Sequence, residues 1–171
     1  MMKLGKVLEE RLTEACETLT ETEFARTGHH LEAEVSAVRI RDFAQILMDA
    51  EYFLVFVSAV DVEPAPRVIY QFDHFTSPCR IKATVPVDGD GAVPTISDIF
   101  TGADWHERET RDLLGVTFTD HPNLIPLLLC EEDVDLKPLA KSEKALKTME
   151  MVTRGYKAKK AAAKKPKEKK S

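Results

Sequence analysis

The stretch with the most chemistry-bearing side chains spans residues 104–122 and reads DWHERETRDLLGVTFTDHP. It combines acidic, basic and histidine side chains with the only tryptophan of the chain. Such a mixture could bind a metal ion, transfer protons in catalysis, or contact another protein. The spacing of these residues, together with the rest of the chain, helps to distinguish the three kinds of site.

A metal site would need ligands that this stretch does not supply. His106 and Glu107 begin the zinc-binding pattern H-E-x-x-H, but Thr110 stands where the second histidine belongs. His121 could provide only a remote ligand. The three cysteines of the chain lie far apart and form no C-x-x-C pair. We therefore expect no metal and no cofactor.

Proton-transfer catalysis also finds little support. A catalytic acid is a carboxyl group whose pKa is raised by an apolar pocket. On a helix, Glu107, Glu109 and Asp112 each have Arg108 or Arg111 within reach, and a nearby cation lowers a carboxyl pKa. The chain also has no nucleophile elbow, dinucleotide-binding glycine pattern or P-loop. The sequence therefore predicts no active site of its own.

The third interpretation is a rigid helix presented to another protein. Trp105, Glu109 and Asp112 share one helix face with Arg108 at its edge, and tryptophan and arginine often anchor interfaces. Arg108 and Asp112 would form an ion pair four residues apart. The competing interpretation is a solvated helix whose tryptophan turns into the core, and the spacing alone favours neither.

Patterns elsewhere predict the elements that must position this helix. The expected elements are helices over 4–19, 41–51 and 104–114, and strands over 30–38, 52–62, 67–75 and 79–87. Because the strands come in a run with hairpin connections, we expect an α+β fold with a mostly antiparallel four-stranded sheet and helices on one face. An extended irregular C-terminal segment follows, and such a segment in a compact domain usually binds something.

The composition is that of a globular protein without a membrane helix or a signal-peptide core, so we expect a cytoplasmic location.

Residues 154–171 carry a net charge of +8 in a chain of net −5, which leaves −13 on the remainder. This lysine-rich tail is expected to be disordered. Nucleic-acid binding through the tail, or another scaffold role, is the alternative function. The acidic body argues against nucleic acid because it repels phosphate.

The residues of the predicted helix and the segment after it resemble the signature of a known family. Glu107-Arg108-Glu109, Asp112-Leu113-Leu114 and His121-Pro122-Asn123-Leu124 look like the pattern of the respiratory-chain NADH dehydrogenase 30 kDa subunit family of complex I. The flanking residues 102–105 and 114–118 match as well. We therefore expect a 30 kDa-subunit-like α+β domain over 1–120, an extended partner-binding segment over 121–153 and the lysine-rich tail over 154–171.

Members of this family carry no redox centre, so the resemblance implies a non-catalytic peripheral subunit on the cytoplasmic face of a membrane. The implied partners are a neighbouring iron–sulfur subunit and a large subunit, which bears the quinone site in complex I. In energy-converting nickel–iron hydrogenases the counterpart packs on the hydrogenase large subunit. The residues expected at the partner interface are Trp105, Glu107, Arg108, Glu109, Asp112, His121 and Pro122.

The chain departs from the family's pattern after residue 124. Ile125 and Pro126 stand where basic residues are usual, and a later proline-containing motif survives only as KPLAKS at 137–142. A short, divergent member fits the dehydrogenase branch and the hydrogenase branch equally, so both stay open.

Overall fold

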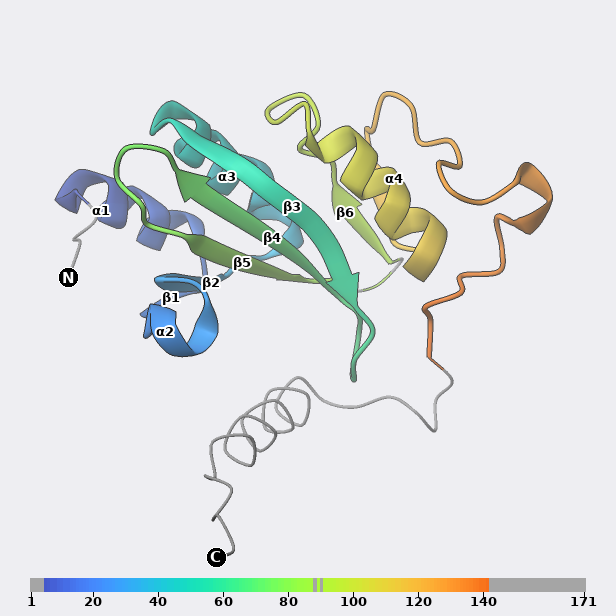
Figure 1. The fold of residues 1–171 in the computed structure, drawn as a ribbon, viewed down its shortest axis with the longest axis horizontal. Helices are drawn as coiled ribbons and strands as arrows, with labels where there is room; N and C mark the ends of the chain where they lie inside the picture. Colours follow the sequence, from blue (N-terminus) through green and yellow to red (C-terminus); the bar gives the residue numbers. More distant parts are fainter. Residues whose placement is uncertain (1–4, 88, 90, 142–171) are drawn as a thin grey trace, which may run out of the picture.

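The computed structural model describes residues 5–87, 89 and 91–141 (Figure 1). The helices are α1 (Lys6–Ala15), α2 (Phe24–Thr27), α3 (Ile40–Asp49) and α4 (Ala103–Leu114), and two 3-10 turns are η1 (Ala37–Arg39) and η2 (Glu131–Asp133). The strands are β1 (Thr18–Glu21), β2 (Leu31–Glu34), β3 (Tyr52–Val60), β4 (Arg67–His74), β5 (Ile81–Pro86), β6 (Ala92–Pro94) and β7 (Thr117–Thr119). The predicted α+β class is confirmed.

The main sheet has five strands in the order β1-β2-β5-β4-β3, so the prediction of a four-stranded sheet is wrong. The hairpin of β4 and β5 is antiparallel as predicted, and so are the pairs β3–β4 and β1–β2. In contrast, β2 and β5 are parallel, with Leu31 opposite Ile81, which makes the sheet mixed. A parallel pair needs a long crossover, and α3, β3 and β4 supply it.

The additional strand β1 begins within the segment predicted as one long helix over 4–19. The helix ends at Ala15, and Thr18 of the next strand lies opposite Glu34 of β2. Threonine is β-branched and favours extended backbone, and two of the four residues of β1 are threonines. Pairing with β2 therefore outweighs the helical spacing of the apolar residues.

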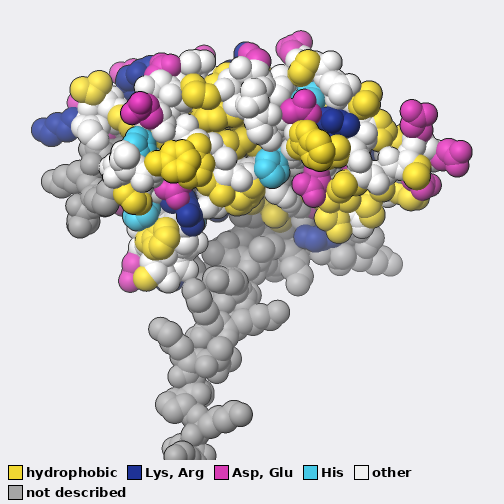
Figure 2. Space-filling view, turned by 45° about the horizontal axis from the view of Figure 1, so that its top comes forward, with side chains coloured by type: hydrophobic (Ala, Val, Ile, Leu, Met, Phe, Trp, Pro, Cys, Tyr) yellow, Lys and Arg dark blue, Asp and Glu magenta, His cyan; other side chains and the backbone are white. Residues whose placement is uncertain are grey.

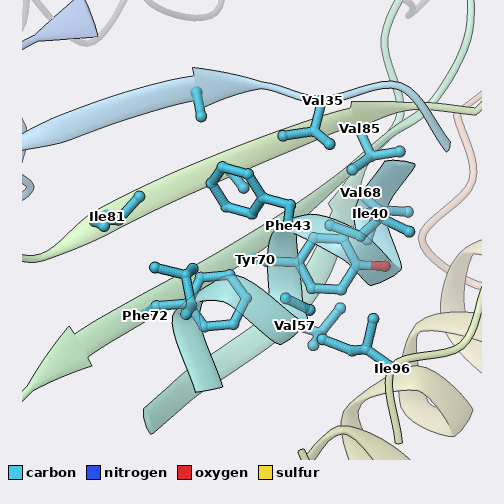
Figure 3. Packing of buried hydrophobic residues seen from close by; sticks show 14 of the residues in the cluster. Val35, Ile40, Phe43, Val57, Val68, Tyr70, Phe72, Ile81, Val85 and Ile96 are labelled. Carbon is cyan, nitrogen blue, oxygen red and sulfur yellow. The ribbon is translucent and has the colours of Figure 1, made fainter. Parts of the chain in front are cut away.

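The core lies on one face of the main sheet. Val68, Tyr70 and Phe72 alternate along β4 and are completely buried (Figure 3). The centroid of the Phe72 ring is 6.5 Å from that of Phe43 on α3 and 5.3 Å from that of Phe100, which precedes α4. This face of β4 is therefore covered by α3 and by the chain that leads into α4.

A second, two-stranded sheet connects the two ends of α4. β6 precedes the helix and β7 follows it, and the two strands pair in parallel, with Val93 opposite Phe118. Gly115 ends the helix with φ of 76°, a left-handed conformation that favours glycine. A Cβ at this position would also lie 2.5 Å from the side chain of Lys137. The small sheet and this turn hold α4 in place beside β3.

No helix within residues 5–87, 89 and 91–141 is long and apolar enough to cross a membrane. The lysine-rich tail over 154–171, and residues 142–153 of the expected partner-binding segment, lie outside the described residues. The part of that segment that the structure describes, residues 121–141, is called the arm below.

Replacing Phe72 with alanine should lower the free energy of unfolding by about 3–5 kcal/mol, because the lost ring leaves a cavity in the core. Phe75→Ala is the matched control: its side chain is 80% exposed, and its loss should change stability by less than about 0.5 kcal/mol. Urea unfolding of both variants measures the difference. Equal effects would contradict the placement of the core on the Phe72 side of the sheet.

Candidate functional site

α4 lies between the sheet and the arm, and its three faces have different environments (Figure 1). Glu107 faces the sheet and is completely buried. Arg108 and Asp112 face the arm and bind its backbone. Trp105 and Glu109 stand on the third face, which is open to solvent, and the Trp105 side chain is 67% exposed. The interpretation in which the tryptophan turns into the core is therefore wrong.

On the sheet face, Glu107 is held by the turn that precedes α4. Its Oε1 accepts a hydrogen bond of 3.0 Å from the backbone N–H of Ile96, and its Oε2 accepts one from the Thr95 hydroxyl. Burial nevertheless raises the pKa of Glu107 to about 7, and the negative charges of Asp104 and Asp98 add to the rise.

The expectation that arginines lower the pKa of every carboxyl on this helix is therefore wrong for Glu107. Arg111 lies four residues along the helix, but its guanidinium turns toward Asp112, at 3.5 Å. Arg108 turns to the arm. Spacing along a helix gives the residues that could meet, whereas the neighbouring elements decide which of them do.

On the arm face, Arg108 and Asp112 bind consecutive peptide groups of the arm instead of each other. Arg108 donates hydrogen bonds of 3.1 Å to the carbonyl oxygens of Ile125 and Pro126. Asp112 Oδ2 accepts hydrogen bonds from the next three backbone N–H groups, those of residues 127–129, at 2.7, 2.8 and 3.2 Å. One basic and one acidic side chain thus satisfy five backbone polar groups, one from each of five successive residues of an irregular segment. We call this pair the clamp.

The clamp explains how Asp112 can be buried and ionised. Burial by itself would raise the pKa of Asp112, but hydrogen bonds from the three backbone N–H groups, together with nearby Arg111, outweigh it and lower the pKa below its usual value. A carboxylate that accepts several N–H bonds is stabilised in its charged form. Asp112 therefore contributes to stability as an anion above the usual pKa of aspartate, and loses that contribution as the pH falls.

The far end of the arm is fastened separately. The backbone N–H of Leu139 donates a 2.9 Å hydrogen bond to the carbonyl of Leu113 at the end of α4. Lys141 donates to Asp61, which follows β3, from its backbone N–H at 2.7 Å and from its Nζ at 2.8 Å. The arm is therefore bound at both ends and in the middle.

The first turn of the arm contains the His121-Pro122 motif. The His121 side chain is completely buried, with Nε2 3.8 Å from Glu107 Oε2 and 4.0 Å from Asp104 Oδ1. Its Nδ1 accepts a hydrogen bond of 3.0 Å from the backbone N–H of Asn123. Pro122 is exposed. The structure thus brings His121 to α4, where it approaches Glu107 and Asp104.

The arm also displays apolar side chains that the sequence analysis did not assign to the partner interface. Those exposed by half or more are Ile125, Leu128, Leu136 and Leu139. Together with Trp105 they account for five of the large exposed hydrophobic side chains of the described residues. Figure 2 shows hydrophobic and charged side chains side by side at the end of the molecule that α4 and the arm occupy. In the sequence, the available sign of these exposed side chains was a run of leucines and prolines without helical or strand periodicity.

The seven predicted interface residues therefore differ in their exposure to solvent. Glu107, Asp112 and His121 are buried side chains that act inside the protein. Arg108 is mostly buried against the arm, while Trp105, Glu109 and Pro122 reach solvent to different extents. Contact with a partner stays a prediction for all seven. Among the residues that the structure describes, no group of three or more histidine, cysteine or acidic side chains could hold a metal ion.

The fold and the site together define a small α+β protein in which one polar helix binds an extended arm and displays a tryptophan. The sequence model of the family described as "Respiratory-chain NADH dehydrogenase, 30 Kd subunit" matches residues 33–149. The match covers more than half of the chain, and the chain belongs to this family.

Several curated relatives are C subunits of NADH-quinone oxidoreductases. The protein of Roseiflexus sp. (strain RS-1) is 38% identical over 119 residues, which is 65% of this chain and 68% of the relative. That of Mesorhizobium japonicum is 46% identical over 81 residues, 43% of this chain and 40% of the relative. That of Phenylobacterium zucineum is 38% identical over 97 residues, 54% of this chain and 46% of the relative. The chain thus spans less than half the length of the last two.

A solved structure with the same fold is a chain of the membrane-bound sulfane sulfur reductase, described as an archaeal respiratory membrane complex. The TM-score is 0.66 at 22% sequence identity, and the match covers 90% of this chain and 91% of that one. At this identity the likeness establishes the fold alone.

Replacing Asp112 with asparagine should release the middle of the arm, because the neutral amide loses charge-assisted hydrogen bonds. We expect the free energy of unfolding to fall by about 1–3 kcal/mol. Hydrogen exchange at the amides of Leu127, Leu128 and Leu129, measured by NMR, should become faster. Glu109→Gln, on the open face of the same helix, is the control and should leave both quantities unchanged. Unaltered exchange in Asp112→Asn would rule out the clamp.

Proposed function

We propose that this protein is a non-catalytic peripheral subunit of a membrane-bound, complex I-like oxidoreductase and that α4 and the arm dock it on the large subunit. One observation carries the proposal. The backbone of the arm is bound to α4, while apolar side chains of the arm and Trp105 stay exposed. Apolar groups that are held in place and left uncovered are typical of an interface.

The clamp favours docking in two ways. It orders the arm before any partner arrives, which reduces the entropy lost on association. It also satisfies the charged groups of Arg108 and Asp112 with backbone hydrogen bonds within the protein, so a partner does not have to desolvate a charge that lacks hydrogen bonds. The apolar side chains would then contribute about 25 cal/mol for each Å² of surface that the partner covers.

The positions of the carboxyl groups support a non-catalytic role. Glu107 and Asp112 are the two residues whose pKa the fold changes most clearly on this helix, yet both side chains are completely buried. Neither side chain is exposed to a substrate in this structure. Their hydrogen bonds are occupied by the turn before α4 and by the arm.

The relatives are named as C subunits of NADH-quinone oxidoreductases, which favours a quinone-reducing complex for this protein. In such a complex the partner would be the large subunit that bears the quinone site, with a neighbouring iron–sulfur subunit beside it. The large subunit of an energy-converting nickel–iron hydrogenase is the alternative partner. In both cases the protein would lie on the cytoplasmic face of the membrane and be held there through the complex.

Replacing Trp105 with alanine should weaken binding to the large subunit about 30-fold or more, because a tryptophan at the centre of an interface often contributes 2 kcal/mol or more. The free energy of unfolding should not change, since the side chain is exposed. Isothermal titration calorimetry of this protein with the purified large subunit measures the affinity. Because the chain has a single tryptophan, 5-fluorotryptophan in this chain alone reports directly whether Trp105 is covered.

Val38→Ala is the matched control. This side chain is 83% exposed on η1, which belongs neither to α4 nor to the arm, and its replacement should leave the affinity unchanged. Wild-type affinity in Trp105→Ala, or an unshifted fluorine resonance in the complex, would refute docking through α4. Binding to a nickel–iron subunit but not to a quinone-site subunit would transfer the protein to the hydrogenase branch.

A further inference from the structure

Three polar atoms for which the described residues provide no hydrogen-bond partner are buried around Glu107. They are the Tyr70 hydroxyl, Asp104 Oδ1 and His121 Nε2. The Tyr70 hydroxyl points away from Phe72 (Figure 3), and its pKa is raised well above the usual value by burial and by the nearby Glu107. Most buried polar atoms in proteins have a partner, so three such atoms around one carboxyl group call for an explanation.

The hydrogen bond of His121 shows where its proton lies. Nδ1 accepts the backbone N–H of Asn123, so this nitrogen carries no proton. The ring is therefore neutral, with its proton on Nε2, the atom nearest to the carboxyl groups of Glu107 and Asp104. A cationic His121 would lose the hydrogen bond that closes the first turn of the arm. His121 therefore cannot neutralise an ionised Glu107 without opening that turn.

We propose that Glu107 is a proton-binding site with His121 as its lid: the protonated acid keeps the first turn of the arm closed on α4, and loss of the proton opens it. In the closed state, an ionised Glu107 and an ionised Asp104 would both face a neutral imidazole in a space shielded from water. Asp104 has a cation, Arg108, at 3.6 Å. The described residues place no cation within 4 Å of Glu107 unless His121 is protonated, and its two hydrogen-bond donors, Ile96 and Thr95, do not outweigh burial beside the buried His121 ring.

The described surroundings of Glu107 are acidic or neutral apart from one cation that is already engaged. The titratable and charged groups near it are Asp104 from α4, Asp98 from the preceding turn, Tyr70 from β4, Arg41 from α3 and His121 from the arm. Asp120, just before the arm, lies near Arg41. Arg41 is engaged by both carboxylate oxygens of Asp98, at 2.7 and 2.6 Å. These surroundings favour the protonated form of Glu107.

The direction of the pH dependence follows from the closed and open states. In the closed state the pKa of Glu107 is about 7. In the open state water reaches the carboxyl group, and its pKa moves toward the usual value for glutamate, about 4.3. The closed state binds the proton more tightly, so closure is strongest below the usual glutamate pKa. Closure weakens as the pH rises and becomes constant above about 7.

Hydrogen exchange of the full chain, followed by NMR between pH 5 and pH 8, tests this inference. After correction for the intrinsic pH dependence of exchange, protection at Asn123 and Ile125 should fall up to about tenfold per pH unit and level off above pH 7. Leu139, at the fastened far end of the arm, should keep constant protection. Glu107→Gln, which cannot ionise, should remove the pH dependence, and Glu109→Gln should retain it.

The carbon-13 resonance of the Glu107 carboxyl group in the unsubstituted chain is a second readout, which is needed if Glu107→Gln fails to fold. A titration near pH 7 that coincides with the loss of protection at Asn123 supports the proposal. Titration in the usual range for glutamate with constant protection overturns it, and so does a pH response of Asn123 that persists in Glu107→Gln. These measurements need no partner subunit, so their outcome is independent of the docking proposal.

Discussion

The carboxylate of Asp112, bound by three successive backbone N–H groups, holds the middle of the arm against α4. An irregular segment has no strand or helix partner for its peptide groups, and unpaired buried groups are strongly unfavourable. Asp112 and Arg108 supply those partners from the side of α4. The arm can therefore stay extended and direct apolar side chains outward. A helix or strand in its place could direct side chains outward only at the regular spacing of that element.

Two carboxyl groups on one helix show how strongly the environment decides ionisation. Asp112 accepts several N–H groups from the arm, and its pKa falls. Glu107 accepts fewer hydrogen bonds from N–H groups, is buried next to other acidic groups, and has a raised pKa. The acid that faces the arm holds it as an anion, whereas the acid that faces the sheet fits its site as a neutral group. The pKa values of two carboxyl groups on adjacent faces of α4 thus shift in opposite directions, because one face meets the core and the other meets the arm.

The motif that carries the resemblance to the 30 kDa subunit family works mainly inside the protein. Glu107, Asp112 and His121 are buried, and Arg108 binds backbone. Their arrangement determines where Trp105 and the apolar residues of the arm are displayed. For a subunit that docks, internal residues of this kind are as necessary as those in direct contact, because a preorganised surface loses less entropy on binding.

Local patterns along the chain were sufficient to predict the α+β class, most of the helices and strands, and the extent of α4 with its stop at Gly115, because apolar periodicity and a left-handed glycine are local signals. They could not show that Arg108 and Asp112 bind the arm instead of each other, that Glu107 is buried, or that β2 pairs with β5 in parallel. Each of these outcomes depends on elements distant in the chain. A helix places a side chain on a face, but the chain that packs on that face determines its partner and its charge.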